Sequence, residues 1–120
     1  MILAINHIQI TIPKGKEPQT KNFYCELLGL KEIEKPEVLK QNGGFWLELA
    51  NIQIHVGTED GVAREKTKSH IAYEVSDIIH WKNIFHSADI KVNESQSVLG
   101  YQRINIRDPF GNKIELMAKN

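Results

Sequence analysis

The strongest constraint on the fold is that the chain presents the same order of segments twice. Asn6-His7-Ile8 resembles Ser69-His70-Ile71, and each triplet opens a stretch in which apolar and polar residues alternate. His7 precedes His55 by 48 residues, and His70 precedes Glu115 by 45. The segment around the predicted helix is also three residues longer in the first half than in the second. This constant offset predicts an internal duplication in which His55 and Glu115 occupy equivalent positions.

Hydrophobic periodicity predicts the order β-α-β-β-β in each half. In the first half we expect a strand over 5–12, a helix from about 17 to 28 that ends at Gly29, and strands over 45–49 and 52–56. In the second half we expect a strand over 70–75, a helix with its N-cap at Ser76-Asp77, and strands over 90–93, 103–107 and 113–118. The residues between 57 and 68, rich in glycine and mixed charges, are expected to link the halves.

Composition narrows the class of protein. Fifteen Lys and Arg balance fifteen Asp and Glu, and this zero net charge argues against nucleic acid as a partner. The longest apolar run, residues 1–5, is far shorter than the roughly 20 residues of a membrane span. A single cysteine, Cys25, cannot form an internal disulfide, which fits the reducing cytoplasm. We therefore expect a cytoplasmic domain with neither a nucleic acid nor a membrane as partner.

Four side chains stand out by their type and by the strand face that they share. In each of the four strands that carry them, residues at alternate positions are apolar and are expected to pack against the helices. The opposite faces carry His7, His55, His70 and Glu115. Three imidazoles and a carboxylate form a ligand set suited to a divalent ion such as Zn, Ni, Co, Mn or Fe(II). A single histidine on the polar face of a strand is more often a solvated surface residue, and this alternative stays open for each of them.

Other polar-face residues are candidates for binding a ligand in the same concavity. Trp46 and Glu48 alternate against apolar neighbours, as do Arg103, Asn105 and Arg107. The alternatives are ordinary core packing for Trp46 and a surface ion pair near the adjacent turn for Arg107. The remaining reactive side chains fit no such pattern. We expect Cys25 to pack in the core and the two remaining histidines to lie on the surface of the second helix, at His80 and His86.

These motifs resemble the vicinal oxygen chelate superfamily, which comprises glyoxalases, bleomycin-resistance proteins and extradiol dioxygenases. The resemblance covers nearly the whole chain and is carried by Ile5-Asn6-His7-Ile8, Phe23-Tyr24, Leu28-Gly29-Leu30, His70-Ile71-Ala72, and Asp108-Pro109-Phe110-Gly111-Asn112 followed by Ile114-Glu115. It implies an α+β fold in which two tandem βαβββ modules form a cup-shaped mixed β-sheet with the helices on its outer face. Module 1 would span about 1–57, a linker 58–68 and module 2 69–120. The resemblance also implies a homodimer.

The same resemblance implies metal ligands at His7, His55, His70 and Glu115, the set already indicated by alternation and spacing. Glyoxalase I commonly has a carboxylate where this chain has His55, so the resemblance does not select that reaction. Two functions of different classes follow. One is a glyoxalase-like lyase, isomerase or oxygenase in which a divalent metal chelates a small oxygenated molecule and Glu115 acts as the base. The other is a metal-free protein of the bleomycin-resistance type that sequesters a small planar compound between Trp46 and the arginines.

Overall fold

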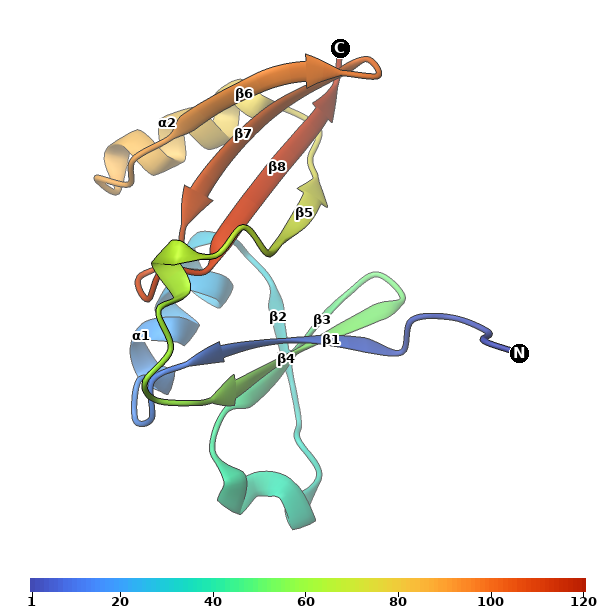
Figure 1. Ribbon diagram of the computed structural model, residues 1–120, viewed down its shortest axis with the longest axis vertical. Coiled ribbons are helices and arrows are strands. Elements are labelled where there is room, and N and C mark those ends of the chain that lie inside the picture. Colours follow the sequence, from blue (N-terminus) through green and yellow to red (C-terminus); the bar gives the residue numbers. More distant parts are fainter. The chain divides into compact units, whose positions relative to one another are not determined.

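The chain folds into two units with the same succession of elements (Figure 1). The computed structural model describes residues 1–120, and its two compact units are Met1–Val62 and Ala63–Asn120. Each unit contains one four-stranded sheet of mixed direction and one main helical segment. The predicted α+β fold with paired βαβββ modules is therefore confirmed.

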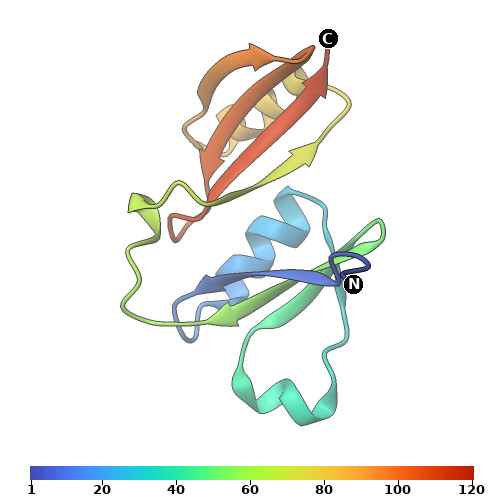
Figure 2. The same ribbon diagram turned by 45° about the vertical axis from the view of Figure 1, so that its right-hand side comes forward.

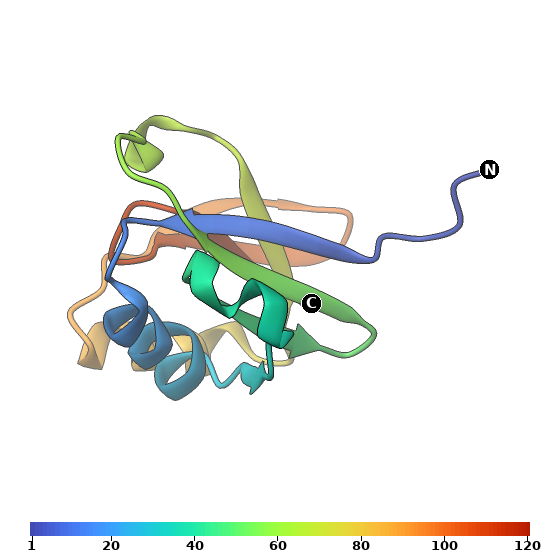
Figure 3. The ribbon, with the colours of Figure 1, turned by 90° about the horizontal axis from the view of Figure 1, so that it is seen from below.

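Unit 1 contains strands β1 to β4. The bounds are His7–Ile12 for β1, Lys31–Ile33 for β2, Phe45–Leu49 for β3 and Ile52–Thr58 for β4. Helix α1, Glu17–Lys21, continues directly into a π-helical segment, Asn22–Leu27, and a separate 3-10 helix spans Glu37–Asn42 (Figure 3). The sheet order is β1-β4-β3-β2, with β1 parallel to β4 and the other two pairs antiparallel.

Unit 2 repeats this arrangement with strands β5 to β8. The bounds are His70–Glu74 for β5, Asn93–Val98 for β6, Tyr101–Arg107 for β7 and Lys113–Lys119 for β8. Helix α2, Ile78–Ser87, covers one face of the sheet, and a short 3-10 helix spans Arg64–Lys66 (Figures 1 and 2). The order β5-β8-β7-β6 again places the first strand parallel to the last. This is the topology of unit 1.

The registers of the two sheets match residue by residue. In unit 1, His55 of β4 lies opposite Gln9 of β1, two residues after His7. In unit 2, Glu115 of β8 lies opposite Ala72 of β5, two residues after His70. The predicted equivalence of positions 55 and 115 is therefore present in the strand pairing.

The apolar face of each sheet forms the core of its unit. Alternation along the strands brings these side chains to one face, where the helical segment covers them. In unit 1 the side chains that are at most 3% exposed include Ile12, Tyr24, Phe45, Leu47, Ile54 and Val56. In unit 2 the corresponding set includes Phe85, Ile104, Ile106, Ile114, Leu116 and Ala118. The faces with His7, His55, His70 and Glu115 are opposite to these cores.

Several local predictions are confirmed, and the one for Cys25 is met only in part. Asp77 caps α2, because its Oδ1 accepts hydrogen bonds from the N–H groups of Ile79 at 2.9 Å and His80 at 3.3 Å. Gly29 has φ +79°, the left-handed conformation expected after the first helix. His80 and His86 are exposed on α2, as predicted. Cys25 is half-buried rather than fully packed, and burial raises the pKa of its thiol.

Several predicted boundaries are wrong, including the end of β4 at Thr58 and the start of β7 at Tyr101, each two residues beyond the prediction. The strand expected at 90–93 lies at Asn93–Val98, because this edge strand of polar residues has no apolar alternation to mark it. The helix expected over 17–28 changes at Asn22 to π-helical bonding, in which Leu28 N–H donates to the Phe23 carbonyl at 3.0 Å. The strand expected from residue 5 begins at His7, and the segment before it extends away from the sheet (Figure 1).

The turn between β7 and β8 is organised by one buried carboxylate. Asp108 is 4% exposed, and its Oδ1 accepts hydrogen bonds from the N–H groups of Phe110 at 2.8 Å and Asn112 at 2.9 Å. Arg107 donates to the carbonyl oxygens of Arg64, Thr67 and Gly111 at 2.9 to 3.2 Å. The Arg107 guanidinium thus joins the 64–67 segment to this turn.

The Tyr73 hydroxyl gives a prediction about stability at high pH. It is buried and has no hydrogen-bond partner, and burial, followed by the nearby charge of Asp108, raises the pKa of Tyr73 to about 12. Because the unfolded chain ionises this group near pH 10, stability should be complete below pH 10 and should fall as the pH rises towards 12. Replacing Tyr73 with Phe should remove this part of the loss, and at pH 7 it should cost less than about 1 kcal/mol because no hydrogen bond is broken. Urea unfolding at pH 7, 10 and 11 measures both effects, and an unchanged pH profile in the variant would contradict them.

Candidate functional site

The polar face of unit 2 brings together a histidine and a carboxylate. His70 is the first residue of β5, and its Nε2 lies 3.5 Å from Oε2 of Glu115 on β8. The Glu115 side chain is only 9% exposed, whereas that of His70 is 36% exposed. Parallel pairing of β5 with β8 brings these residues, 45 positions apart in sequence, onto the same face. The sequence predicted this proximity.

The tautomer of the His70 imidazole is set by the backbone. Its Nδ1 lies 2.8 Å from the carbonyl oxygen of Lys68, and a carbonyl oxygen can only accept a hydrogen bond. Nδ1 therefore carries the proton, and in the neutral imidazole Nε2 holds the lone pair. This lone pair faces the Glu115 carboxylate. A backbone carbonyl that orients a histidine in this way is typical of metal-binding imidazoles.

The separation of these two atoms fits a shared divalent ion. Bonds from Zn²⁺ to histidine nitrogen and to carboxylate oxygen are each about 2.1 Å long, so two ligands at a tetrahedral angle lie about 3.4 Å apart. The Nε2–Oε2 separation is 3.5 Å. Two lone-pair atoms this close would repel each other unless a proton or a cation lay between them. The geometry of His70 and Glu115 is thus compatible both with a direct ion pair and with two positions of a metal site.

Arg103 holds the other oxygen of the same carboxylate. Its NH1 lies 2.7 Å from Oε1 of Glu115, and its Nε donates to the Gln96 carbonyl at 3.0 Å. The guanidinium thus orients Glu115 so that Oε2 faces His70. In the structure the side chain of Arg103 contacts Glu115 and the Gln96 carbonyl, and its role in binding a ligand stays a prediction. Local sequence patterns do not indicate this ion pair, because it depends on the register between β7 and β8.

The polar face of unit 1 carries a stack of three rings. The His55 imidazole lies between Trp46, at a centroid distance of 3.8 Å, and His7, at 4.0 Å. The interplanar angles are only 4° and 15°. Trp46 is opposite His55 in the β3–β4 pairing, which explains the first contact. His55 is 8% exposed, so this stack buries it almost completely.

Hydrogen bonds set the orientation of both imidazoles in the stack. His55 Nε2 lies 2.9 Å from Gln53 Oε1, and His7 Nδ1 lies 2.9 Å from Asn6 Oδ1. Burial lowers the pKa of His55, and the nearby His7 and Lys35 lower this pKa further. His55 is therefore held in its neutral form, in which an imidazole can bind a metal.

The ring stack determines how the two candidate ligands of unit 1, His7 and His55, are oriented. A nitrogen lone pair lies in the plane of its ring, so two nearly parallel rings direct their lone pairs into separate planes. In this arrangement His7 and His55 do not point at one common ion. Of the two, His7 is exposed, whereas His55 is enclosed by rings on both faces. Within neither unit do three or more His, Cys, Asp or Glu side chains gather in an arrangement that could hold a metal.

The other predicted ligand-binding residues differ in their surroundings. Glu48 forms an ion pair with Lys31 at 3.4 Å on the exposed side of β3. Asn105 donates a hydrogen bond to Ser95 Oγ at 3.1 Å. Arg107 binds backbone carbonyls and is a structural residue of the β7–β8 turn. Trp46 lines a hollow in unit 1.

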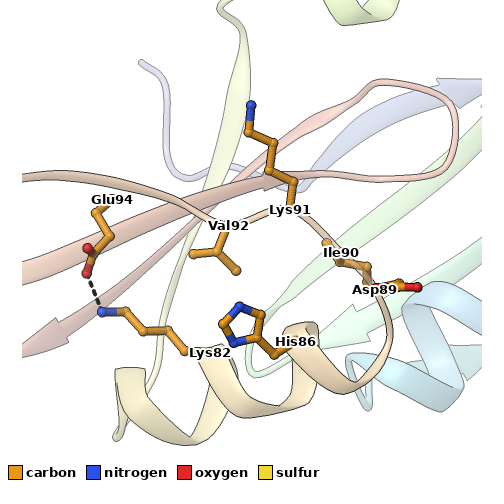
Figure 4. A pocket seen from close by; sticks show the side chains of 7 residues that line it. All are labelled: Lys82, His86, Asp89, Ile90, Lys91, Val92 and Glu94. Carbon is orange, nitrogen blue, oxygen red and sulfur yellow. Dashed lines mark hydrogen bonds and ion pairs between the residues drawn. The ribbon is translucent and has the colours of Figure 1, made fainter.

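Each unit has a hollow of a size that could hold a small molecule. The hollow in unit 1 has a volume of about 330 Å³ and is lined by Trp46, His55 and Lys35, among others. That in unit 2, of about 480 Å³, lies at the end of α2 and contains none of the predicted site residues (Figure 4). Its Lys82 is bound to Glu94, so the charges of this second hollow partly cancel. Sequence reasoning missed Lys35 because an isolated lysine before a proline matches no motif.

Two βαβββ units with histidine and glutamate side chains on their polar faces define the architecture that a comparison with known families can identify. The Glyoxalase/Bleomycin resistance protein/Dioxygenase superfamily matches this sequence over residues 4–116. The chain belongs to this superfamily. A comparison with curated proteins finds no match.

Solved structures of similar fold support this membership. A glyoxalase family protein from Bacillus anthracis is 36% identical, with a TM-score of 0.90 over 100% of this chain and 98% of that one. A fosfomycin resistance protein, FosX from Listeria monocytogenes, crystallised with Mn(II) and sulfate, is 19% identical, with a TM-score of 0.81 over 100% and 93%. A lactoylglutathione lyase from Agrobacterium tumefaciens is 17% identical, with a TM-score of 0.73 over 96% and 92%. The latter two share the fold with this chain.

Proposed function

We propose that this protein is a divalent-metal-dependent enzyme of the lyase or isomerase type that acts on a small oxygenated molecule. The observation that carries the proposal is the pairing of His70 Nε2 with Glu115 Oε2 at 3.5 Å, with the His70 tautomer fixed by the Lys68 carbonyl. The FosX structure that contains Mn(II) supports a metal in a protein of this fold. His7 and His55, the other ligands predicted from the sequence, belong to unit 1.

The metal ion, Glu115 and Arg103 would each have a separate role in the reaction. A bound divalent ion supplies Lewis acidity, which polarises a substrate oxygen. Glu115 would hold the ion through Oε2, and only after releasing the ion would this oxygen accept a proton from the carbon next to the substrate carbonyl, as general-base catalysis requires. Arg103, bound to Oε1, would hold the carboxylate in place during this transfer. Neutral histidines bring no charge, so Glu115 is the only anionic residue among the four predicted ligands.

Metal uptake tests the proposal directly. We expect chelator-treated protein to bind about one divalent ion per chain, with Zn, Ni, Co, Mn and Fe(II) as the ions to compare. Calorimetric titration and elemental analysis measure the affinity and the stoichiometry. Replacing His70 with Ala should weaken binding, whereas replacing the exposed His80 with Ala should not. Failure to bind any of these ions at micromolar concentration would contradict the proposal.

A second candidate is a metal-free protein that sequesters a small planar compound, and the hollow beside Trp46 favours it. The two functions differ in their dependence on metal. If a compound binds with equal affinity in the presence and absence of chelator, and no metal is taken up, the second candidate replaces the first.

We propose a homodimer in the cytoplasm as the working form. Assembly is in keeping with the resemblance to superfamily members, and the zero net charge presents no electrostatic barrier to it. None of the helices is long and apolar enough to cross a membrane. Light scattering measures the assembly, and the mass of one chain at high concentration would contradict it.

A further inference from the structure

The hollow of unit 1 has a one-sided charge. Its lining includes the side chains of Gln9, Lys35, Asn42, Trp46 and Thr58, and it includes no aspartate or glutamate. Lys35 is the only residue of the lining with a permanent charge, and the amides of Gln9 and Asn42 add neutral hydrogen-bond donors. A hollow with these groups favours an anion over a cation or a neutral molecule.

Lys35 differs from Lys21 and Lys82, two other half-buried lysines, in what it contacts. Lys21, in the same unit, is paired with Glu32 at 3.1 Å, and Lys82 in unit 2 is paired with Glu94. Lys35 takes part in none of the ion pairs of the structure. Its Nζ donates to the carbonyl oxygen of Gly43, which leaves two further N–H groups on the ammonium. The carbonyl therefore positions the charge without neutralising it.

A carboxylate lies beside the same glycine pair, that of Glu17, whose Oε1 is buried and has no hydrogen-bond partner. Glu17 Oε2 accepts a hydrogen bond from the Gly44 N–H at 3.1 Å, and Glu17 is not part of the lining. The aromatic part of the lining consists of Trp46 and His55. An incoming anion would thus meet one ammonium group, several neutral donors and an aromatic wall.

We infer that this hollow binds the anionic oxygen group, a carboxylate or a phosphonate, of the small molecule on which the protein acts, with Lys35 as the charged anchor. The statement that this anion belongs to the substrate rests on the function proposed above. A volume of about 330 Å³ lies at the low end of ligand sites, roughly 300 to 1,000 Å³, so the molecule is small. The anchor is a binding residue and takes no part in proton transfer.

The test uses the fluorescence of Trp46 in chelator-treated protein. Replacing Trp81 with Phe leaves Trp46 as the only tryptophan, and Trp46 lines the hollow. Benzoate and phenylphosphonate serve as anionic probes, and benzamide serves as a neutral probe of similar shape. We expect at least one of the anions to change the emission and to bind about tenfold or more tightly than benzamide, since a hydrogen bond to a charged group is stronger than a neutral one. The anion that binds more tightly identifies the type of oxygen group.

Variants locate the binding. Replacing Lys35 with Met should weaken binding of the anion about tenfold or more, and replacing Lys35 with Arg should retain most of it. Lys40 is the matched control, because it lies in the neighbouring 3-10 helix, is exposed, and pairs with Glu34 and Glu37 outside the lining. Replacing Lys40 with Met should leave the affinity unchanged. Circular dichroism checks that each variant is folded.

Three results would overturn the inference. These are benzamide binding as tightly as the anions, equal weakening by the two Met variants, and no Lys35-dependent binding of either anion at millimolar concentration. Since the titration contains chelator, its outcome is separate from that of metal uptake. Protein that binds metal but no anion would refute the inference alone, and protein that binds the anion but no metal would refute only the proposed function.

Discussion

Replacing Glu115 with Gln is expected to lower the affinity for a divalent metal by about 100-fold or more. The substitution preserves the size of the side chain but removes the only negative charge among the predicted ligands. It also exchanges a carboxylate oxygen, 3.5 Å from His70 Nε2, for an amide, which binds hard and borderline cations more weakly. Loss even of an outer hydrogen-bond partner usually costs 10- to 100-fold in metal affinity. Calorimetric titration of chelator-treated protein measures the change.

The same variant tests the role of Glu115 as a base. At saturating metal, turnover of any substrate should fall by at least ~100-fold, the usual scale for loss of a general base. Glu94 provides the matched control, because it is an exposed glutamate paired with Lys82 in the same unit. Glu94 replaced with Gln should retain both metal binding and turnover. If the Glu115 variant binds metal normally but is inactive, Glu115 is a base and not a ligand. Full activity would transfer the role of base to another group, with Glu74 as the first to examine.

Replacing Gly44 with Ala is expected to destabilise the protein by at least about 3 kcal/mol. Gly44 has φ +78°, and a Cβ atom at this position would lie 2.0 Å from the Val56 carbonyl oxygen. The Val56 carbonyl group cannot move aside without shifting β4. The steric overlap therefore adds to the cost of the left-handed conformation, which is itself about 1 to 2 kcal/mol. Because β4 carries His55, the shift would also disturb the ring stack. Urea unfolding measures the loss.

Gly15 separates the two contributions. Its φ is +80°, nearly that of Gly44, but a Cβ atom there would meet nothing within 4 Å. Ala at position 15 should therefore cost only about 1 to 2 kcal/mol, the conformational part alone. Equal losses for the two variants would show that the Val56 carbonyl yields to the added methyl group, contrary to the expectation for Gly44.

The sequence predicted those features of the fold that depend on local periodicity. Alternation assigned Ile54 and Val56 to the core and His55 to the opposite face, and the repeat spacing matched position 55 to 115. Strand β6 could not be recognised, because an edge strand with one half-buried residue, Ser95, has no apolar periodicity. The same limit applies to the contacts at the candidate site.

Side-chain contacts across strands were beyond the reach of local patterns. The faces of Trp46 and His7 were predicted, but stacking against His55 requires the β3–β4 and β1–β4 registers together. Likewise, Arg103 was placed on the correct face, yet its ion pair with Glu115 depends on how two long side chains cross between β7 and β8. Lys35 was not singled out, since its position depends on a carbonyl eight residues later, that of Gly43.

The matching registers of the two sheets have a consequence for how such a protein can evolve. Positions 55 and 115 are equivalent in the strand pairing of the two sheets. His55 nevertheless lies between aromatic rings, whereas Glu115 is bound to an arginine. The hydrophobic cores lie on the opposite faces, so the two copies could diverge at these positions without losing the packing that keeps them folded. Duplication followed by divergence at a single strand position would thus have produced two chemically distinct surfaces from one scaffold. A library that varies only positions 7, 55, 70 and 115 should accordingly yield mostly folded proteins with different ligand preferences.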